Sequence, residues 1–307
     1  MNNINICMIC DDNYVLPTRV AICSMAKNRK ARSHINFYVL GDGLSTYSIL
    51  SLTNMNRFIG VRVNVMDKSD LLKTYENINQ SRHVTPAALL KFFLPQIFYN
   101  YDKILYLDSD IIVQDDLSEL YNTDISDKYA VGIKDTLCVV NRQYMDNVGI
   151  NNEFYFNSGV MLLNLKKMRD DNITEKLIKY RLEVPQHFMD QDAFNAIIGS
   201  NVRFVSWKYN FLNYYMTVLD TRQLSSFFGY DFNKPFWKIY DSAIILHLGG
   251  KEKPWNQDMG YLSVIWHKYY KLLSHSKSGL RLFYKTISHK GEVFFWFKGI
   301  KIACFKP

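Results

Sequence analysis

Two aspartates, Asp108 and Asp110, interrupt the apolar run KILYLDSDIIV at residues 103–113. Side chains in a strand alternate between its faces, so both carboxylates are expected on one face, with Ser109 turned away. Two anionic carboxylates at this spacing repel each other, and a divalent cation between them removes that cost. The pattern therefore indicates a metal site, although a bare D-x-D is also explained by a strand that ends in a polar turn.

A third candidate ligand, His247, follows the apolar run AIIL and opens the segment HLGGKEKPW. A histidine at such a position can also be purely structural. The glycines at 249 and 250 let backbone amides approach an anion, and Lys253 adds a cation for phosphate. Two aspartates, one histidine and phosphate oxygens form a mixed ligand set that suits Mn²⁺, with Mg²⁺ as a less typical occupant.

The elements that must position these residues alternate along the chain. Short β-favouring runs at 4–10, 35–42 and 61–67 are separated by helix-length segments such as 45–58 and 88–100. This alternation predicts an α/β fold with a mostly parallel sheet, whose ligand crevice lies at the carboxyl ends of its strands. Further strands are expected in 129–135, 158–165, 201–207 and 242–250. Asp108 and Asp110 thus fall where such a fold binds ligands.

Composition sets the class of protein. The chain has 307 residues, 48% of them hydrophobic, which suffices for one large domain with an appendage. Cys7 and Cys10 would point to opposite faces of a strand, so we interpret them as core residues and not as a metal or disulfide pair. The first residues resemble no signal peptide, and a cytoplasmic protein is expected.

The positive charge lies at the C-terminal end. Residues 268–307 hold nine of the 37 Lys and Arg residues and one of the 29 acidic residues, so residues 1–267 are neutral overall. The aromatic run from Val293 is broken by Lys298 and Gly299, too early for the roughly 20 apolar residues of a membrane-spanning helix. Nucleic acid binding and a solvated helix face are alternatives, but we predict a peripheral contact with an anionic membrane surface and no nucleic acid.

Five motifs, taken in order, resemble glycosyltransferase family 8. They are MICDDNY (8–14), LYLDSD (105–110), FNSGVMLLNL (156–165), DQDAFN (190–195) and HLGGKEKPW (247–255). The pattern is similar to that of bacterial galactosyl- and glucosyltransferases that build lipooligosaccharide and lipopolysaccharide cores. The resemblance implies a GT-A fold, with a single Rossmann-like sheet flanked by helices, a UDP-sugar donor, Mn²⁺ and retention of anomeric configuration. It also implies a glycan acceptor, and with it a place on the inner face of the cytoplasmic membrane.

The resemblance assigns roles residue by residue. The residues that match the family's metal ligands are Asp108, Asp110 and His247. Its nucleotide contacts are matched by Asp11 and Asn13, and its diphosphate contacts by Gly250 and Lys253. Its donor-sugar contacts are matched by Asp135, Asn157 and Asp190, and Gln191 matches the residue at the reactive face of the anomeric carbon. Lys91, where the family has an arginine, and Ser109 are also assigned to donor binding. Lysine keeps the positive charge of arginine but lacks its planar fork. His83 and Phe188 are weaker candidates for the acceptor site.

The proposed catalytic residues are Asp190 and Gln191, and because a glutamine is a poor nucleophile, attack from the face that the diphosphate leaves is the favoured route. Asp190 or Asp192 could instead simply cap a helix. The predicted division is a catalytic domain at 1–255 and a basic, helical, membrane-associating extension at 256–307. Two alternative functions stay open: a non-catalytic sugar-nucleotide or glycan-binding protein, and a sugar-phosphate nucleotidyltransferase. The latter usually has a glycine-rich basic loop after its first strand, which CDDNYVLP lacks.

Overall fold

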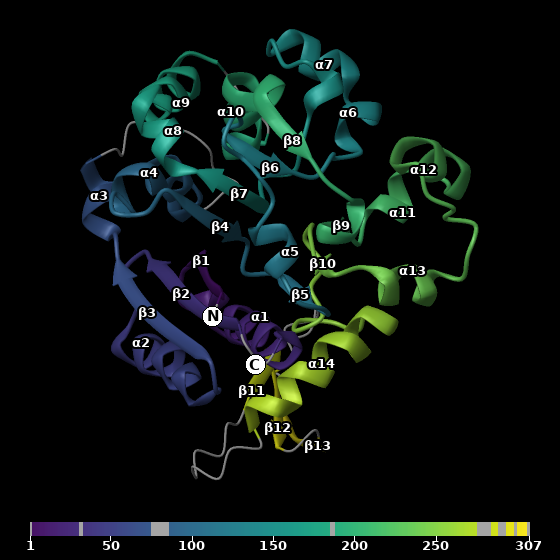
Figure 1. Ribbon diagram of the computed structural model, residues 1–307. Coiled ribbons are helices and arrows are strands. Elements are labelled where there is room, and N and C mark those ends of the chain that lie inside the picture. Colours follow the sequence, from purple (N-terminus) through teal and green to yellow (C-terminus); the bar gives the residue numbers. More distant parts are fainter. Residues whose placement is uncertain are drawn as a thin grey trace.

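The computed structural model describes residues 2–30, 33–74, 86–184, 188–274, 284–287, 293–297 and 300–305. Its largest element is a seven-stranded sheet in the order β3-β2-β1-β4-β7-β6-β8 (Figure 1). The strands are β1 (Asn2–Cys10), β2 (Ser33–Gly41), β3 (Val61–Asp67), β4 (Lys103–Leu107), β6 (Ala130–Gly132), β7 (Val160–Asn164) and β8 (Val202–Phe204). The pairs among β3, β2, β1 and β4 are parallel, whereas β7 runs antiparallel to β4 and β6. The predicted mostly parallel α/β sheet is confirmed.

Helices cover both faces of this sheet. The α-helices of the described residues are α1 (Val15–Asn28), α2 (Thr46–Thr53), α3 (Ser69–Thr74), α4 (Leu94–Ile97), α5 (Ser118–Tyr121), α6 (Leu137–Val140), α7 (Arg142–Asn147), α8 (Leu165–Asp170), α9 (Ile173–Glu183), α10 (Met189–Ile198), α11 (Tyr215–Val218), α12 (Thr221–Phe228), α13 (Phe236–Ser242) and α14 (Tyr261–Ser274). One apolar cluster includes side chains of α1, α2 and α14, and a second includes those of α4, α8, α9 and α10. Cys10 belongs to the first cluster and Cys7 to the second, as strand alternation predicts.

Two predicted helices are shorter than expected. Ser45 caps α2, its Oγ accepting from the backbone N of Ser48 at 3.3 Å, but the α-helix ends at Thr53 and continues as a 3₁₀ helix at Asn54–Arg57. In the segment predicted at 88–100, a 3₁₀ helix at Pro86–Phe93 precedes the single turn of α4, which contains Pro95. Proline fixes φ and lacks a backbone donor, so it is tolerated only in such a first turn.

The run 103–113 does not form one strand. β4 ends at Leu107, and β5 (Ile111–Val113) belongs to a second sheet with β10 (Ile245–His247) and β9 (Phe211–Leu212). Between the two strands, the Ser109 hydroxyl donates to the Ile9 carbonyl at 2.8 Å, and the backbone N of Leu248 donates to the Asp110 carbonyl at 2.8 Å. The prediction of a continuous strand was wrong, because these contacts turn the chain from one sheet into the other. The two aspartates therefore lie in the connection.

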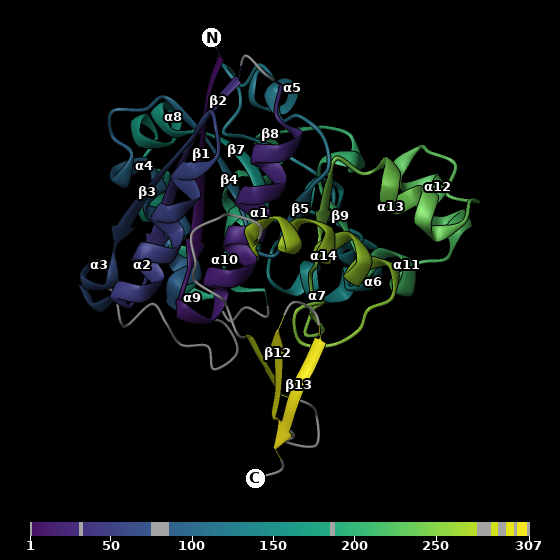
Figure 2. The same cartoon turned by 90° about the horizontal axis from the view of Figure 1, so that it is seen from below.

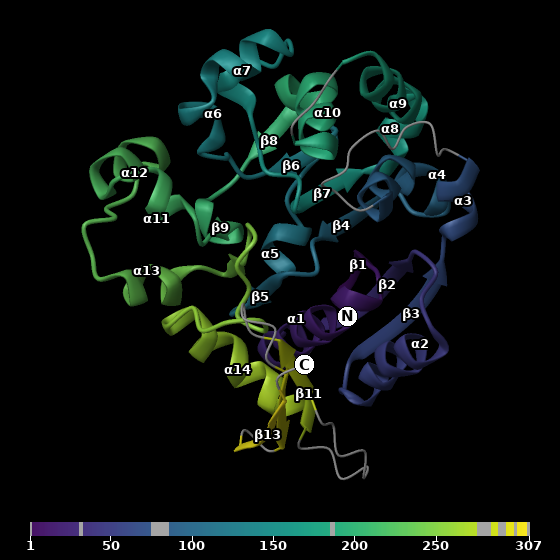
Figure 3. The same ribbon diagram turned by 180° about the vertical axis from the view of Figure 1, so that it is seen from behind.

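The C-terminal region has two parts. α14 packs on α1, and Leu262, Trp266 and Tyr269 are buried in the core. Beyond it, β11 (Tyr284–Ile287), β12 (Val293–Phe297) and β13 (Ile300–Phe305) form an antiparallel sheet. Figure 2 shows β12 and β13 extending away from the remainder of the fold, and Figure 3 shows α14 next to α1. The expected helical extension thus holds for α14 alone. In the described ranges no helix is long and apolar enough to cross a bilayer.

Candidate functional site

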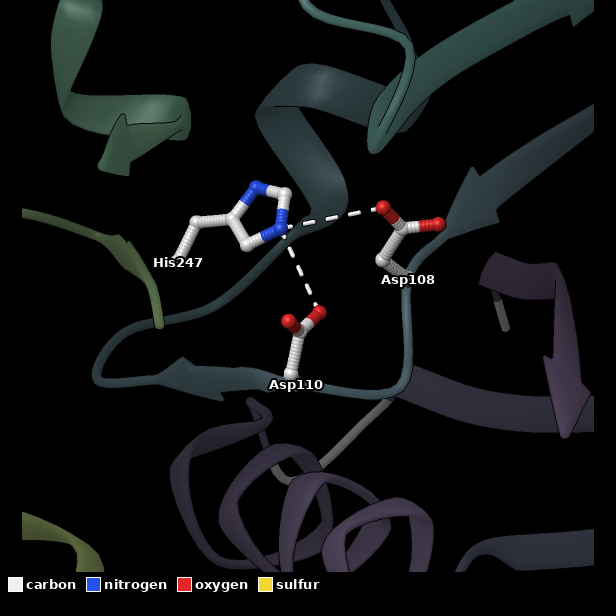
Figure 4. Close-up of side chains that lie close together, drawn as sticks. All are labelled: Asp108, Asp110 and His247. Carbon is white, nitrogen blue, oxygen red and sulfur yellow. Dashed lines mark ion pairs between the residues drawn. The ribbon is translucent and has the colours of Figure 1, made fainter. Parts of the chain in front are cut away.

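The side chains of Asp108, Asp110 and His247 converge (Figure 4). His247 Nε2 lies 3.3 Å from Oδ1 of Asp110 and 3.7 Å from Oδ2 of Asp108. One ligand atom from each residue lies within 4.8 Å of the others. β10 pairs with β5 so that His247 stands opposite Ile111, and this register brings the histidine to the turn that carries the aspartates. The sequence prediction of this juxtaposition is confirmed.

A glycine makes room for the cluster. Gly159 lies against it, and a Cβ atom built there would overlap Cε1 of His247 and lie 2.6 Å from Oδ2 of Asp108. Its carbonyl accepts from the backbone N of Asp108 at 2.8 Å, which fixes the aspartate's backbone against β7. Two carboxylates and an imidazole nitrogen at these separations suit a divalent cation with mixed oxygen and nitrogen ligands, so the residues present fit the expected metal.

A lysine ammonium also neutralises Asp110. The Nζ of Lys253 lies 2.5 Å from Oδ2 of Asp110 and also donates to the carbonyl of Leu248. Burial would raise the pKa of Asp110, but His247 and then Lys253 outweigh it and hold this pKa below its usual range. Asp110 therefore carries its negative charge throughout the neutral pH range.

Lys91 bridges two carboxylates. Its Nζ lies 3.1 Å from Oδ1 of Asp108 and 2.7 Å from Oδ2 of Asp190, and above the ring of Tyr106. Burial would lower the pKa of Lys91, but Asp108 and then Asp190 outweigh this and raise it above the usual lysine value. The Tyr106 hydroxyl donates to the same oxygen of Asp108 at 2.6 Å. Lys91 thus joins the predicted metal ligand Asp108 to the predicted sugar contact Asp190.

Replacing Lys91 with methionine should destabilise the metal-free protein by about 3 to 5 kcal/mol, because it leaves the buried carboxylate of Asp190 and the half-buried carboxylate of Asp108 without their cation. The measurement is urea-induced unfolding in EDTA. Lys73→Met is the matched control: Lys73 pairs with Asp70 on the surface, where water and salt screen the pair and its loss should change the stability little. Equal losses for the two variants would contradict the structural role of Lys91.

The predicted donor-sugar residues form a buried polar group beside the predicted metal ligands. Gln191 Nε2 donates to Oδ2 of Asp135 at 3.2 Å, and Asn157 Nδ2 donates to the same oxygen at 3.2 Å. Tyr214 donates to Asp135 as well. Asp135 is fully buried, no cationic side chain of the described residues pairs with it, and burial raises its pKa. The structure therefore brings Asp135, Asn157, Asp190 and Gln191 together, next to Asp108.

The predicted nucleotide contacts lie at the end of β1. Asp11 Oδ1 accepts from the backbone N of Tyr14 at 3.0 Å and begins a short 3₁₀ helix, in which Asn13 is exposed. The rings of Tyr14 and Trp255 meet edge to face at 6.0 Å, and Lys253 lies over Trp255. The Tyr14–Trp255 pair therefore links the end of β1 to Lys253, which pairs with Asp110.

Two other predicted donor-binding residues, Ser109 and Gly250, shape the backbone around the site. Ser109 is buried, and its hydroxyl donates a hydrogen bond to the Ile9 carbonyl, so its side chain connects β1 to the turn that carries Asp108 and Asp110. Gly250 has φ +84°, a conformation that residues with a Cβ rarely adopt, and nothing lies within 4 Å of the space that a Cβ would fill. The backbone at Gly250 is therefore open on the side where a Cβ would lie.

The acceptor candidates are placed only in part. His83 lies outside the described residues. Phe188 is half-buried at the start of α10, and its ring packs edge to face on that of Tyr144 at 6.0 Å. Its backbone N donates to Oδ2 of Asp192 at 3.0 Å, so Asp192 satisfies the helix start, whereas Asp190 faces Lys91.

Four residues of the site were not singled out from the sequence. Tyr106 and Ser158 contact Asp108 and Asp190, the latter through a 2.8 Å hydrogen bond from the Ser158 hydroxyl. Tyr214 contacts Asp135, and Asn210 contacts Nδ1 of His247 at 2.9 Å. Tyr106 and Ser158 lie within quoted motifs and could have been found there. Asn210 and Tyr214 lie in no recognised motif.

Comparisons with known proteins identify the family of this chain. The model of the family described as glycosyl transferase family 8 matches residues 5–259. The chain is 29% identical over 254 residues to general stress protein A of Bacillus subtilis, covering 81% of this chain and 86% of that protein. It is 27% identical over 281 residues to the lipopolysaccharide 1,2-glucosyltransferase of Escherichia coli K12, covering 88% of this chain and 77% of that protein.

A solved structure shows the same architecture. The galactosyltransferase LgtC, in complex with donor and acceptor sugar analogues, matches with a TM-score of 0.73 at 25% identity, covering 90% of this chain and 98% of that chain. Some other relatives are longer, and the chain spans only 43% to 61% of their length.

Proposed function

Because this chain belongs to glycosyl transferase family 8 and has a GT-A type fold, we propose that it is a retaining hexosyltransferase that takes galactose or glucose from a UDP-sugar. The observation that carries the proposal is the convergence of Asp108, Asp110 and His247 within 4.8 Å, next to the buried Asp190 and Gln191. The pairing of metal ligands with a polar sugar pocket is what transfer from a nucleotide-sugar requires. A protein that only bound the sugar nucleotide would have little use for the full set.

Mn²⁺, held by Asp108, Asp110 and His247, would stabilise the negative charge that develops on the departing diphosphate. Lys253 and the backbone amide of Gly250 would supply further positive charge to the same phosphates. For Lys253 this requires that its ammonium turn from Asp110 to the phosphate. Asp11 and Asn13 would contact the nucleotide. Lys91 and Ser109 would support donor binding, Lys91 through its ion pairs with Asp108 and Asp190.

Sugar transfer with retention would follow the front-face route. The bond from the anomeric carbon to the β-phosphate oxygen breaks, the acceptor oxygen bonds to that carbon on the same face, and the acceptor proton passes to the leaving phosphate. Both ends of the Gln191 amide are already hydrogen-bonded, and Asp190 is paired with Lys91. These bonds favour roles in orientation and charge for both residues, and not covalent attack on the sugar.

We expect UDP-galactose or UDP-glucose to be hydrolysed in the presence of Mn²⁺ and not in EDTA. The measurement is UDP release from a panel of UDP-sugars, each with Mn²⁺, with Mg²⁺ and without metal. Binding of every donor without turnover would instead identify a non-catalytic binding protein. Formation of UTP from UDP-glucose and pyrophosphate would identify a nucleotidyltransferase.

The acceptor is proposed to be a hydroxyl of a bacterial cell-surface glycan of the lipopolysaccharide or lipooligosaccharide core type, in keeping with the relative from E. coli. Such an acceptor is lipid-linked, so the enzyme would work in the cytoplasm on the inner face of the membrane. A basic hollow at the end of α14 supports this location: it is lined by Ala26, Lys27, Arg29, Arg57, Phe58, Ile59 and Leu272. Ile59 is 87% exposed there. α14 ends at Ser274, two residues after Leu272.

Removal of residues 275–307 should abolish sedimentation with vesicles of phosphatidylglycerol and phosphatidylcholine while leaving UDP-sugar hydrolysis unchanged. The deletion begins after α14 because that helix is part of the core, so the predicted extension at 256–307 cannot be removed whole. Vesicles of phosphatidylcholine alone are the control for charge. Undiminished sedimentation of the shortened chain would refute a membrane role for the segment.

A further inference from the structure

A line of buried side chains connects the metal cluster to the sugar pocket. Nδ1 of His247 lies 2.9 Å from Oδ1 of Asn210, and Nδ2 of Asn210 donates to Oδ1 of Asn157 at 2.9 Å. Nδ2 of Asn157 then donates to Oε1 of Gln191 at 2.9 Å. Asn210 is fully buried, and Asn157 and Gln191 are no more than 7% exposed. The line therefore has little access to water that could replace any of its bonds.

The direction of every bond in this line follows from groups that cannot reverse. The backbone N–H of Gly159 donates to Oδ1 of Asn157 at 3.0 Å, and the backbone N–H of Ser158 donates to Oε1 of Gln191 at 3.2 Å. A backbone N–H can only donate, so both side-chain oxygens must be acceptors. At the far end, the carboxylate of Asp135 accepts from both amides. The orientations of Asn157 and Gln191 are therefore determined independently of His247.

The orientation of Asn210 follows in turn. Because Oδ1 of Asn157 is an acceptor, Asn210 must present its NH₂ group to it, and its own oxygen must face His247. That oxygen can only accept, so Nδ1 of His247 must carry a hydrogen. The other ring nitrogen, Nε2, is the one that faces Asp108 and Asp110.

We propose that Asn210 is a positioning residue that holds His247 with Nδ1 protonated and Nε2 directed at the metal, and that couples this ligand to the orientation of Asn157 and Gln191. The inference rests on the proposed function for its metal and its donor. Bonds from the second nitrogen of a ligating histidine orient the ring and increase its basicity, and their loss typically costs about 10- to 100-fold in metal affinity. Asn210 would in addition join two parts of the site that must act on the same donor molecule.

Two substitutions separate the two ends of the Asn210 amide. Asn210→Leu removes both bonds, whereas Asn210→Asp keeps an acceptor for His247 and loses the donor to Asn157. The matched control is Asn213→Leu, three residues further along the chain. The side-chain oxygen of Asn213 has no hydrogen-bond partner among the described residues. Each metal-free variant is first unfolded by heat and followed by circular dichroism, and only the variants that are folded are compared further.

The first readout is the ¹⁵N spectrum of the His247 ring in the metal-free protein, recorded as the pH is raised until the ring loses its positive charge. The second is the Kd for Mn²⁺ from the electron paramagnetic resonance signal of the free ion. The wild type and Asn210→Asp should show a hydrogen on Nδ1 and Mn²⁺ affinities within a few-fold of each other. Asn210→Leu should lose the single tautomer and bind Mn²⁺ about 10- to 100-fold more weakly. Asn210→Asp should still have a lower kcat for UDP-sugar hydrolysis, because Asn157 has lost its donor.

A wild-type tautomer and Mn²⁺ affinity in Asn210→Leu would overturn the inference, as would equal Mn²⁺ losses in the Leu and Asp variants. If the wild type bound no Mn²⁺, the proposed function would fail, while the ring spectrum would still report whether Asn210 selects the tautomer.

Discussion

Replacing Asp110 with asparagine is expected to lower sugar transfer by about 10²- to 10³-fold, the loss typical when one electrostatic contact to a developing charge is removed. The change replaces a charged carboxylate ligand with a neutral amide. It also deprives Lys253 of the carboxylate 2.5 Å from its ammonium and leaves His247 beside one aspartate in place of two. Metal binding and diphosphate stabilisation should therefore weaken together. UDP release from the preferred donor and the Kd for Mn²⁺ measure the two effects.

The control for Asp110→Asn is Asp70→Asn, which makes the same chemical change in a side chain that is 95% exposed. This variant should keep wild-type turnover and wild-type Mn²⁺ affinity. If Asp110→Asn also kept both, the metal site and the proposed function that depends on it would have to be abandoned. A loss of transfer with unchanged Mn²⁺ affinity would instead assign Asp110 to orienting Lys253.

Some site residues could be predicted from the sequence, because their chemistry requires a particular residue type at a particular spacing. Asp108, Asp110 and His247 were grouped correctly although 137 positions separate the second from the third. The β-favouring runs likewise predicted the central sheet, because strand propensity and apolar pattern are local properties. The comparisons then confirmed the family that the five motifs suggested.

The remaining features depend on contacts between distant residues. The turn after Leu107 is made by Ser109 bonding to Ile9, a residue 100 positions away, and no local pattern marks it. Asn210 contacts His247 and Asn157, at separations of 37 and 53 positions, and a single asparagine in the segment WKYNFL carries no signal of that role. Lys91 was noted for its charge, but its place between Asp108 and Asp190 became apparent only in the fold.

Replacing Gly159 with alanine should weaken Mn²⁺ binding and sugar transfer by about 10²-fold while leaving the protein folded. The added methyl group would overlap Cε1 of His247 and lie 2.6 Å from Oδ2 of Asp108 and 2.9 Å from Oδ1 of Asn157. One of these groups must shift, and a displacement of about 1 Å in a catalytic site can cost that factor. Gly159 has no left-handed φ, so alanine adds no backbone strain.

The control for this variant is Gly199→Ala, where the nearest atoms to a new Cβ lie at 3.5 Å or beyond, an ordinary contact distance. Gly199→Ala should bind Mn²⁺ and turn over donor like the wild type. The Kd for Mn²⁺, with thermal unfolding of the metal-free proteins, separates a local effect from a loss of structure. Wild-type Mn²⁺ affinity in folded Gly159→Ala would show that the metal does not need His247 and Asp108 where they lie, because the methyl group cannot be accommodated without moving one of them or Asn157.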